Sequence, residues 1–331
     1  MTINIAINGL GRIGRLILRA VFELDRGEFN IVSVNGPASL DEHIHLLKYD
    51  SVHGIFPGDI SSEGGDLVIN GKKIKLQQER NIENLDWTGV DILLECSGRF
   101  NNRDAASAHL KNKAKKIIVS APCKNADSTI VYGVNNQALL KNHEVISIGS
   151  CTTNCLAPIA KVLNDNIGIE AGFMTTIHSY TNDQRILDGS HKDLRRARSA
   201  AVSMIPSSTG AAKALGIVLP ELAGKLDGSA VRVPTPNVSM IDLCFTANRD
   251  TSIEEINQII ASNANSVLGV AEAPLVSVDF THNSHSSIFD PFETKVVNKR
   301  FCRVISWYDN EWGFSVRMLD VAKLFAEINN A

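Results

Sequence analysis

The sequence predicts an α/β protein of two domains, a doubly wound parallel sheet followed by an α+β domain with a mostly antiparallel sheet. Three observations support this prediction. In the first half of the chain, short β-rich runs alternate with helical stretches, as in crossover units of a parallel sheet. Beyond about residue 150 the β-rich runs continue with fewer helices between them. The length of 331 residues is also ample for two domains.

The boundary is expected near residue 150, with residues 1–150 as the first domain and residues 151–314 as the second. The expected elements of the first domain are a strand at Ile3–Asn8, a helix at Arg12–Leu24, and strands at Asn30–Asn35, Asp91–Ser97, Lys116–Ala121 and Glu144–Ile148. Strands of the second domain are expected at Gly172–His178, Ala230–Val233, Val238–Thr246, Leu275–Phe280 and Cys302–Tyr308. Apolar residues at helical spacing predict a helix over residues 315–331 that packs back onto the first domain.

Composition restricts the class of protein. Hydrophobic residues make up 44% and charged residues 21%, and the formal charge is −3, so neither a nucleic-acid surface nor a membrane surface is indicated. No apolar run approaches the roughly 20 residues that cross a bilayer, and no signal peptide is recognisable. The six cysteines are scattered through a large chain, which favours reduced thiols. We therefore expect a cytoplasmic protein.

A glycine motif lies between the first strand and the first helix. In Gly9-Leu10-Gly11-Arg12-Ile13-Gly14, the first glycine allows a tight turn, the second lets a pyrophosphate approach, and the third permits close helix–strand packing. Exposed amides at the helix start attract phosphates. The motif predicts a Rossmann-type dinucleotide site, and the alternative is a plain structural turn.

The end of the second strand lacks the acidic residue that usually binds the adenosine ribose. Asn35 is followed by Gly36 and Pro37, so the carboxylate that repels a 2′-phosphate is missing. The cofactor can thus be NAD or NADP, and Gly36→Asp is expected to raise selectivity for NAD. In the alternative, Gly36 is a turn glycine and Asp41 or Glu42 reaches in.

Cys151 is the candidate nucleophile. Ser150 is a good N-cap for the helix that follows the Glu144–Ile148 strand, which puts Cys151 in the first turn, where the helix dipole favours the thiolate. Cys155 lies one turn later among apolar residues and fits a small core residue better than a metal ligand, since no second ligand pair stands nearby. No metal site is predicted.

The chain geometry supplies a base for this cysteine. A helix from Thr152 to about Ile167 travels roughly 24 Å away, and a strand from Ala171 to His178 returns roughly 23 Å. His178 should therefore end level with Cys151 and act as a proton shuttle.

Anion sites are indicated downstream. A basic run covers residues 192–198, and residues 207–213 look like a helix start with free hydroxyls and amides. Arg232 lies in an apolar strand and needs a carboxylate or a bound phosphate as partner. Two anion positions around a Cys–His pair suit a phosphorylated substrate and a second phosphate.

Taken together, these segments resemble the phosphorylating glyceraldehyde-3-phosphate dehydrogenase family over essentially the whole chain. The matching segments are Ile7–Arg15, Lys48–Ser51, Ser150–Pro158, Ser208–Ala214, Arg232–Asn237 and Ser306–Gly313. The resemblance implies that Cys151 attacks the aldehyde of glyceraldehyde 3-phosphate, with His178 as base. Hydride then passes to the nicotinamide, and inorganic phosphate releases the thioester as 1,3-bisphosphoglycerate, in glycolysis or gluconeogenesis.

The resemblance also assigns binding residues. Thr181 and Arg232 would hold the substrate phosphate. The attacking phosphate would be held by Ser150, Thr152, Thr209, Gly210 and an arginine, for which Arg198 is favoured over Arg196. Cofactor contacts would come from Gly9, Gly11, Arg12, Ile13, Gly14, Asn35, Gly36, Arg80, Ser97, Gly98, Ser120, Asn182 and Asn310, with Asn310 on the nicotinamide carboxamide. The segment Ser179–Ala201 resembles the loop that packs between subunits of a homotetramer.

Two departures from the family pattern concern the cofactor. Gly36 stands where the family often has aspartate, and Gly189-Ser190 stands where members strongly selective for NAD show Leu-Pro. Both weaken selectivity for NAD. A third departure, Ile148-Gly149 before Ser150, removes no catalytic group.

Two other functions remain open on the sequence. Erythrose-4-phosphate dehydrogenase is a sister enzyme with hydrolytic release, and retention of Thr209–Lys213 argues for phosphate instead. The other is a non-catalytic RNA- or protein-binding role on the same scaffold, although no dedicated nucleic-acid site is expected.

Overall fold

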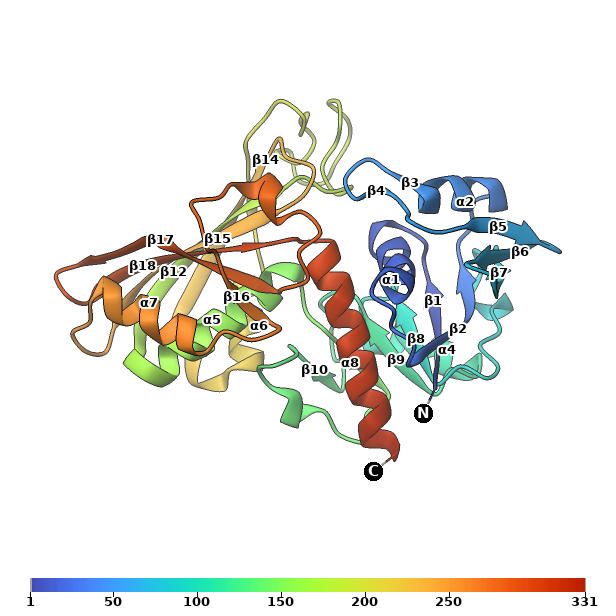
Figure 1. The fold of residues 1–331 in the computed structure, drawn as a ribbon, viewed down its shortest axis with the longest axis horizontal. Helices are drawn as coiled ribbons and strands as arrows, with labels where there is room; N and C mark the ends of the chain where they lie inside the picture. Colours follow the sequence, from blue (N-terminus) through green and yellow to red (C-terminus); the bar gives the residue numbers. More distant parts are fainter. Residues whose placement is uncertain (1, 331) are drawn as a thin grey trace. The chain divides into compact units, whose positions relative to one another are not determined.

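The computed structural model describes residues 2–330, and the chain forms two compact units (Figure 1). One unit combines the chain up to Gly149 with the segment from Ser315 onward; the other runs from Ser150 to Phe314. The first contains a sheet with mostly parallel pairing and the second a mostly antiparallel sheet, so the predicted fold class is confirmed. No helix among residues 2–330 is both long enough and apolar enough to span a bilayer.

The first unit is built on a nine-stranded sheet with the order β10-β11-β9-β8-β1-β2-β7-β6-β5. Its strands are β1 (Ile3–Asn8), β2 (Phe29–Asn35), β5 (Ile60–Glu63), β6 (Asp66–Ile69), β7 (Lys72–Gln77), β8 (Ile92–Glu95), β9 (Lys116–Val119), β10 (Ser128–Thr129) and β11 (Val145–Ser147). Pairing is parallel from β10 to β7, and β5, β6 and β7 form an antiparallel meander. The central β1 pairs with β2 on one side and with β8 on the other, so the strand order reverses there, at the kind of switch point where doubly wound sheets bind ligands.

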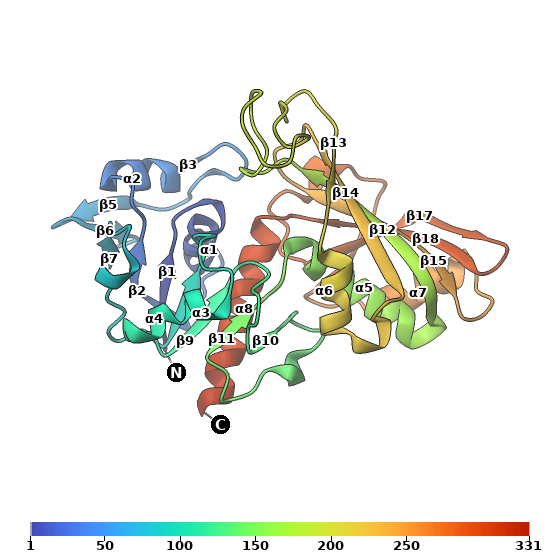
Figure 2. The same cartoon turned by 180° about the vertical axis from the view of Figure 1, so that it is seen from behind.

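Helices cover both faces of this sheet because its strands are apolar on both sides. They are α1 (Arg12–Glu23), α2 (Leu40–Lys48), α3 (Arg103–Ala106) and α4 (Ala108–Lys111), and a small two-stranded sheet pairs β3 (Tyr49–Asp50) with β4 (Gly54–Ile55). Figure 1 shows α1 in front of the sheet, and Figure 2, seen from behind, shows α3 and α4 on the opposite face. In β1 the side chain of Ile7 faces α1, whereas Ala6 packs in the cluster that contains Ala106 of α3.

The C-terminal helix α8 (Trp312–Asn330) contributes its segment from Ser315 to the first unit. Arg26 Nη1 donates to Asp320 at 3.0 Å, and the ammonium of Lys116 lies 5.2 Å from the ring centroid of Phe325. These contacts attach the helix to the N-terminal sheet.

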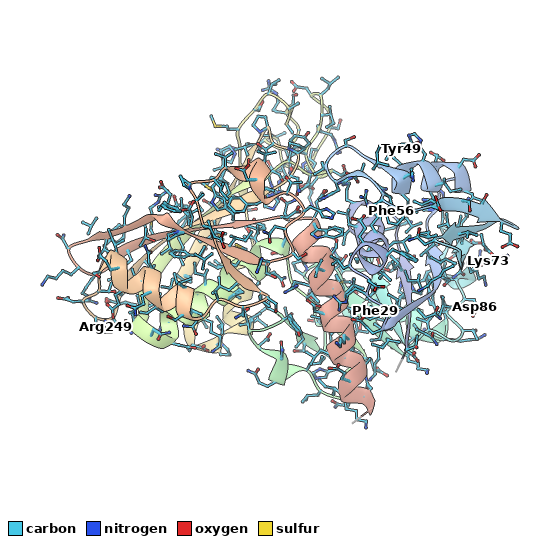
Figure 3. The ribbon with its side chains drawn as sticks, in the orientation of Figure 1. Phe29, Tyr49, Phe56, Lys73, Asp86 and Arg249 are labelled. Carbon is cyan, nitrogen blue, oxygen red and sulfur yellow. The ribbon has the colours of Figure 1, made fainter. Side chains whose placement is uncertain are left out.

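Arg19 shows how the first unit tolerates a buried charge. Its guanidinium donates to Glu23 at 2.6 Å and to the Gly54 carbonyl at 3.0 Å, and it lies over the ring of Phe56. In Figure 3, Phe56 lies inside this unit and Lys73 and Asp86 lie at its surface. The buried arginine is therefore paired and hydrogen-bonded, as a buried charge must be.

The second unit has a seven-stranded sheet with the order β13-β14-β12-β15-β18-β17-β16. Its strands are β12 (Ile169–Ser179), β13 (Ile205–Ser208), β14 (Leu226–Val233), β15 (Ser239–Ala247), β16 (Leu268–Val270), β17 (Ser287–Val297) and β18 (Phe301–Tyr308). Three helices, α5 (Cys151–Ile167), α6 (Ala211–Val218) and α7 (Ile253–Ser262), lie on one face (Figures 1 and 2). Alternating burial along β15 matches a sheet that is covered on one face.

One predicted strand is wrong. Leu275–Phe280 contains a 3₁₀ helix at Ser277–Phe280. The carboxylate of Asp279 accepts the Val276 N–H at 2.9 Å, which closes a turn, and Val276 and Val278 are exposed. The local side-chain hydrogen bond therefore competes successfully with β propensity. The short β5–β6–β7 meander was absent from the sequence prediction.

The three motif glycines meet different constraints in the structure. Gly9 has a φ of +100°, and a Cβ there would lie 2.5 Å from the backbone N of Ser97. A Cβ on Gly14 would lie 1.9 Å from the Gly9 carbonyl oxygen, whereas a Cβ on Gly11 would meet nothing within 4 Å. A side chain at Gly9 or Gly14 would thus collide with backbone, whereas Gly11 borders open space.

We predict that Gly14→Ala lowers the free energy of unfolding by about 1–3 kcal/mol or more, because the added methyl group overlaps backbone. Gly11→Ala is the matched control and should cost no more than about 1 kcal/mol, the effect of an unfavourable N-cap residue. Denaturant unfolding without cofactor measures both variants. An equal loss of unfolding free energy in the two variants would contradict the different constraints at Gly14 and Gly11.

Candidate functional site

Cys151 is the first residue of α5. The Ser150 hydroxyl accepts the Thr153 N–H at 3.1 Å, so the predicted N-cap is confirmed. The helix then runs to Ile167, and β12 returns along the sheet and ends at Ser179. Cys151 Sγ lies 3.5 Å from His178 Nε2 as a result.

His178 is fixed from its other side by Arg232. The two residues are register partners on the parallel pair β12–β14. Arg232 Nη1 lies 2.6 Å from His178 Nδ1 and donates to the Ser179 carbonyl at 3.0 Å. The same Nδ1 lies 2.8 Å from the Ser179 carbonyl oxygen, which can only accept, so this nitrogen has both a donor and an acceptor within hydrogen-bond distance. The partner of Arg232 is thus an imidazole and a carbonyl, where the sequence predicts a carboxylate or phosphate.

The electrostatics keep both partners neutral. Burial, and then the charge of Arg232, lower the pKa of His178 to about 3. Burial raises the pKa of the Cys151 thiol, although Arg232 and the hydrogen bonds at the helix start oppose this effect. The hydrogen bonds at the helix start thus lower the pKa of this thiol, as the sequence predicts, while loss of hydration raises it more.

Tyr308 is a site residue that the sequence prediction missed. Its hydroxyl lies 2.9 Å from both Thr152 Oγ1 and Thr176 Oγ1, and Thr176 Oγ1 donates to the Met240 carbonyl at 3.0 Å. This direction makes Tyr308 donate to Thr176 and accept from Thr152. The tyrosine therefore ties the first turn of α5 to β12, two residues before His178. A tyrosine in a buried strand signals such a role, because its hydroxyl needs a partner.

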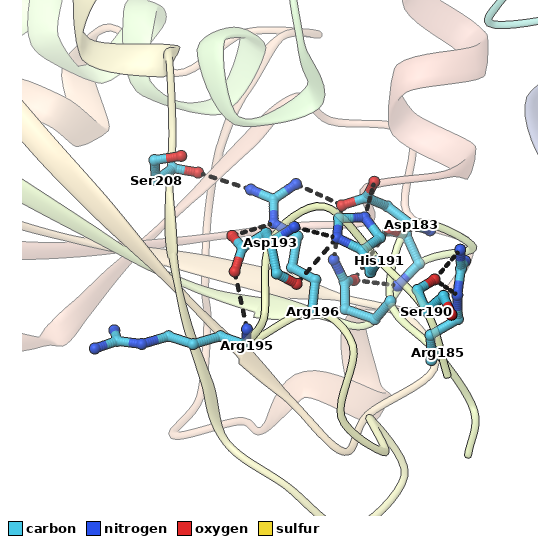
Figure 4. A network of polar contacts seen from close by, with 10 residues as sticks. Asp183, Arg185, Ser190, His191, Asp193, Arg195, Arg196 and Ser208 are labelled. Atoms are coloured by element: carbon cyan, nitrogen blue, oxygen red, sulfur yellow. Dashed lines mark hydrogen bonds and ion pairs between the residues drawn. The ribbon is translucent and has the colours of Figure 1, made fainter. Parts of the chain in front are cut away.

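The basic loop separates its arginines (Figure 4). Arg196 Nη1 donates to Asp183 at 2.5 Å, and its Nη2 lies 3.4 Å from the Ser208 carbonyl, next to Thr209. Arg198 donates to Asp188 at 2.9 Å, and its side chain is 69% exposed. Arg195 extends its side chain away from this network. The arginine beside the predicted anion loop is Arg196.

Beside that loop, the Thr209 hydroxyl accepts the Ala211 N–H at 3.2 Å, and Gly210 precedes α6. The Thr181 hydroxyl donates to Gln184 at 3.2 Å, and Asn182 is exposed.

Arg232 Nε is buried and has no hydrogen-bond partner among residues 2–330. An oriented donor of this kind is suited to a bound anion.

Asn310 is oriented by two serines. Its Oδ1 accepts from Ser179 Oγ and from Ser239 Oγ, each at 2.9 Å, and Asn310 is 6% exposed. The oxygen is thus saturated, and the amide nitrogen is left as the donor for a ligand. The preceding Asp309 accepts from Asn237 Nδ2, His282 N, Glu311 N and Trp312 N.

The first unit contains a pocket of about 340 Å³ at the carboxyl ends of β1, β2 and β8. It is lined by several of the predicted cofactor residues, namely Gly9, Gly11, Asn35, Gly36, Arg80 and Ser97. The open space beside Gly11 fits a close-lying pyrophosphate. The pocket lining does not include Arg12, Ile13, Gly14, Gly98 or Ser120. Arg12 instead forms a bidentate ion pair with Asp50.

Comparison with known proteins identifies the relatives of this chain. Residues 3–103 match the family model of the glyceraldehyde 3-phosphate dehydrogenase NAD binding domain, and residues 150–310 match that of the C-terminal domain. The chain belongs to the glyceraldehyde-3-phosphate dehydrogenase family. It thus contains an NAD(P)-binding domain, and the pocket lies largely within the residues that match it.

Curated relatives agree over nearly the full length. Glyceraldehyde-3-phosphate dehydrogenases of Cereibacter sphaeroides and Xanthobacter flavus are each 56% identical, over 327 and 328 residues, covering 97% of this chain and 98% of the relative. That of Geobacillus stearothermophilus is 51% identical over 333 residues, covering 98% of this chain and 99% of the relative.

A buried polar network supports the pocket of this family member, and the sequence prediction missed it. Glu95 accepts from Asn8 Nδ2 at 2.5 Å, from Ser97 N at 2.7 Å and from His109 Nε2 at 2.9 Å. His109 Nδ1 accepts from Trp87 at 3.1 Å, which places the ring proton on Nε2. The Glu95 carboxylate therefore holds Ser97 in the pocket wall through the hydrogen bond to its backbone N–H.

We predict that Arg232→Ala raises the pKa of His178, because it removes one of the two causes that depress it. Histidine-labelled NMR, with the signal assigned through His178→Asn, measures the titration. Between pH 8 and 5 the unmodified chain should show no titration of this ring. Arg198→Ala is the control and should leave the signal unchanged. Titration of His178 near pH 6.5 in the unmodified chain would contradict this description.

Proposed function

We propose that the chain catalyses the oxidation of D-glyceraldehyde 3-phosphate, with inorganic phosphate and NAD(P)+, to 1,3-bisphosphoglycerate and NAD(P)H. The observation that carries the proposal is the 3.5 Å contact between Cys151 Sγ and His178 Nε2, beside the guanidinium of Arg232. The family membership and the anion-binding groups around this pair support it.

Arg232 couples substrate binding to proton transfer. When the substrate phosphate draws Arg232 away from Nδ1, the nearby Ser179 carbonyl, 2.8 Å from Nδ1, can accept an Nδ1–H. The ring proton then sits on Nδ1, and a free Nε2 faces the thiol. His178 takes the proton of Cys151 as the sulfur attacks the aldehyde carbon.

NAD(P)+, when bound, would supply the hydride acceptor that converts the Cys151 hemithioacetal into a thioester, and His178 would take up the proton of the hemithioacetal hydroxyl. Asn310 would hold the nicotinamide carboxamide through its amide N–H, and Ser179 and Ser239 fix the side chain of Asn310 for this contact.

Two anion positions complete the site. Thr181 and Arg232 bind the substrate phosphate. Ser150, Thr152, Thr209, Gly210 and Arg196 bind the attacking phosphate, with Arg196 in place of the exposed Arg198.

We further propose a cytoplasmic homotetramer. Five apolar side chains of the loop region, Ile186, Leu187, Leu194, Val202 and Met204, are between 62% and 82% exposed. An exposed apolar group of this size is typical of a surface that a partner covers. A second copy of the chain is the expected partner.

His178→Asn is expected to slow hydride transfer by about 10²–10⁴-fold, since the base for Cys151 is lost. Rapid mixing with excess glyceraldehyde 3-phosphate, followed by absorbance of the reduced cofactor, measures this step. Cofactor affinity should not change. An unchanged rate would remove His178 from the mechanism.

Arg196→Ala is expected to raise the KM for inorganic phosphate by about 10–100-fold, the effect of losing a charge-assisted hydrogen bond. Arg198→Ala is the matched control and should keep the KM of the unmodified enzyme. Steady-state rates against phosphate concentration distinguish the two. Turnover independent of phosphate would instead favour a hydrolytic enzyme of the erythrose-4-phosphate dehydrogenase type.

A further inference from the structure

Gly36 follows the last residue of β2 in the wall of the first unit's pocket. This is the position from which an acidic side chain usually reaches the adenosine ribose. A Cβ built on Gly36 would lie 2.5 Å from His43 Cε1, 2.6 Å from His43 Nε2 and 3.2 Å from Leu10 Cβ. The space that a side chain at position 36 would need is therefore filled by the imidazole of His43.

His43 cannot easily give up this space. It projects from α2, is 3% exposed, and its Nε2 lies 3.1 Å from the Gly36 carbonyl oxygen, which can only accept. The proton is therefore on Nε2. The helix itself is fixed by a capping box, in which Ser39 Oγ accepts the Glu42 N–H and Glu42 accepts the Ser39 N–H at 2.9 Å. Moving the ring to make room at position 36 would therefore break its hydrogen bond to the Gly36 carbonyl and disturb a buried, closely packed side chain.

The pocket around this pair carries more positive than negative side chains. Arg15, Arg80 and Arg99 line it, whereas Glu79 is the one acidic residue among its lining side chains. Arg80 and Arg99 are exposed and can turn toward a ligand. Such a wall attracts an additional phosphate, and no carboxylate at position 36 repels it.

We propose that Gly36 and His43 form a coupled specificity pair, in which the imidazole excludes a carboxylate from position 36 and so admits the 2′-phosphate of an NADP-type adenosine. This inference rests on the proposed use of a dinucleotide. It changes the expectation for Gly36→Asp, because the aspartate cannot enter while His43 is present. Selectivity for NAD then requires two substitutions.

Binding of two cofactor fragments tests the pair without catalysis. Adenosine 2′,5′-bisphosphate and 5′-AMP differ only in the 2′-phosphate, and isothermal titration of the full-length chain measures their Kd. The unmodified chain should bind the bisphosphate at least as tightly as 5′-AMP. Gly36→Asp alone should lower the Tm and weaken both fragments.

The double variant Gly36→Asp with His43→Ala should regain the Tm and bind 5′-AMP, but bind the bisphosphate about 100-fold more weakly, through charge repulsion. Gly36→Ala with His43→Ala is the uncharged control and should bind the bisphosphate with the Kd of the unmodified chain. His45→Ala, at an exposed histidine on the same helix, should not rescue Gly36→Asp.

Three results would overturn the proposal that Gly36 and His43 act as a coupled pair. One is a Gly36→Asp chain with unchanged Tm that rejects the bisphosphate, and another is an unmodified chain that binds 5′-AMP but not the bisphosphate. The third is rescue by His45→Ala. If the unmodified chain binds neither fragment and no NAD+, the dinucleotide site itself is wrong, and the failure lies in the proposed function.

Discussion

The contact between Cys151 and His178 depends on one topological constraint, the return of β12 along the sheet after α5. The helix starts at the nucleophile and moves away from it, and the strand ends at the base. Parallel pairing of β12 with β14 then places Arg232 on the far side of the imidazole. The Cys151 sulfur, the His178 imidazole and the Arg232 guanidinium thus form a row, which is placed by the start of α5 and by the pairing of β12 with β14.

Burial of this row shifts the pKa of both Cys151 and His178. Loss of water favours the neutral thiol and the neutral imidazole, and the adjacent guanidinium further disfavours a protonated ring. In the proposed mechanism the reactive thiolate is generated when substrate binds, with His178 as the base. Polar groups around the row, notably Tyr308 and the serines on Asn310, hold its geometry while leaving donors directed at ligands.

Local patterns were sufficient to predict much of this protein. The glycine motif, the Ser150 N-cap and a strand that reaches His178 each follow from rules that act within a few residues, and the structure has all three, although β12 extends beyond the predicted Ala171–His178 at both ends. What the sequence could not predict depends on contacts between distant segments. The partners of Tyr308 are of this kind, and the packing of His43 against Gly36 and the different partners of Arg196 and Arg198 depend on side-chain placement that sequence spacing does not determine. The effect of burial on the pKa of Cys151 likewise cannot be predicted from the sequence, because burial is a tertiary property.

The covalent role of Cys151 is the central claim, and trapping the acyl-enzyme tests it most directly. The enzyme would be mixed with glyceraldehyde 3-phosphate and NAD(P)+ in the absence of inorganic phosphate, quenched in acid, digested and examined by mass spectrometry. The account predicts a 3-phosphoglyceroyl group on the peptide that contains Cys151, removed when phosphate is added. Reduced cofactor formed in a burst without any acyl group on that cysteine would contradict it.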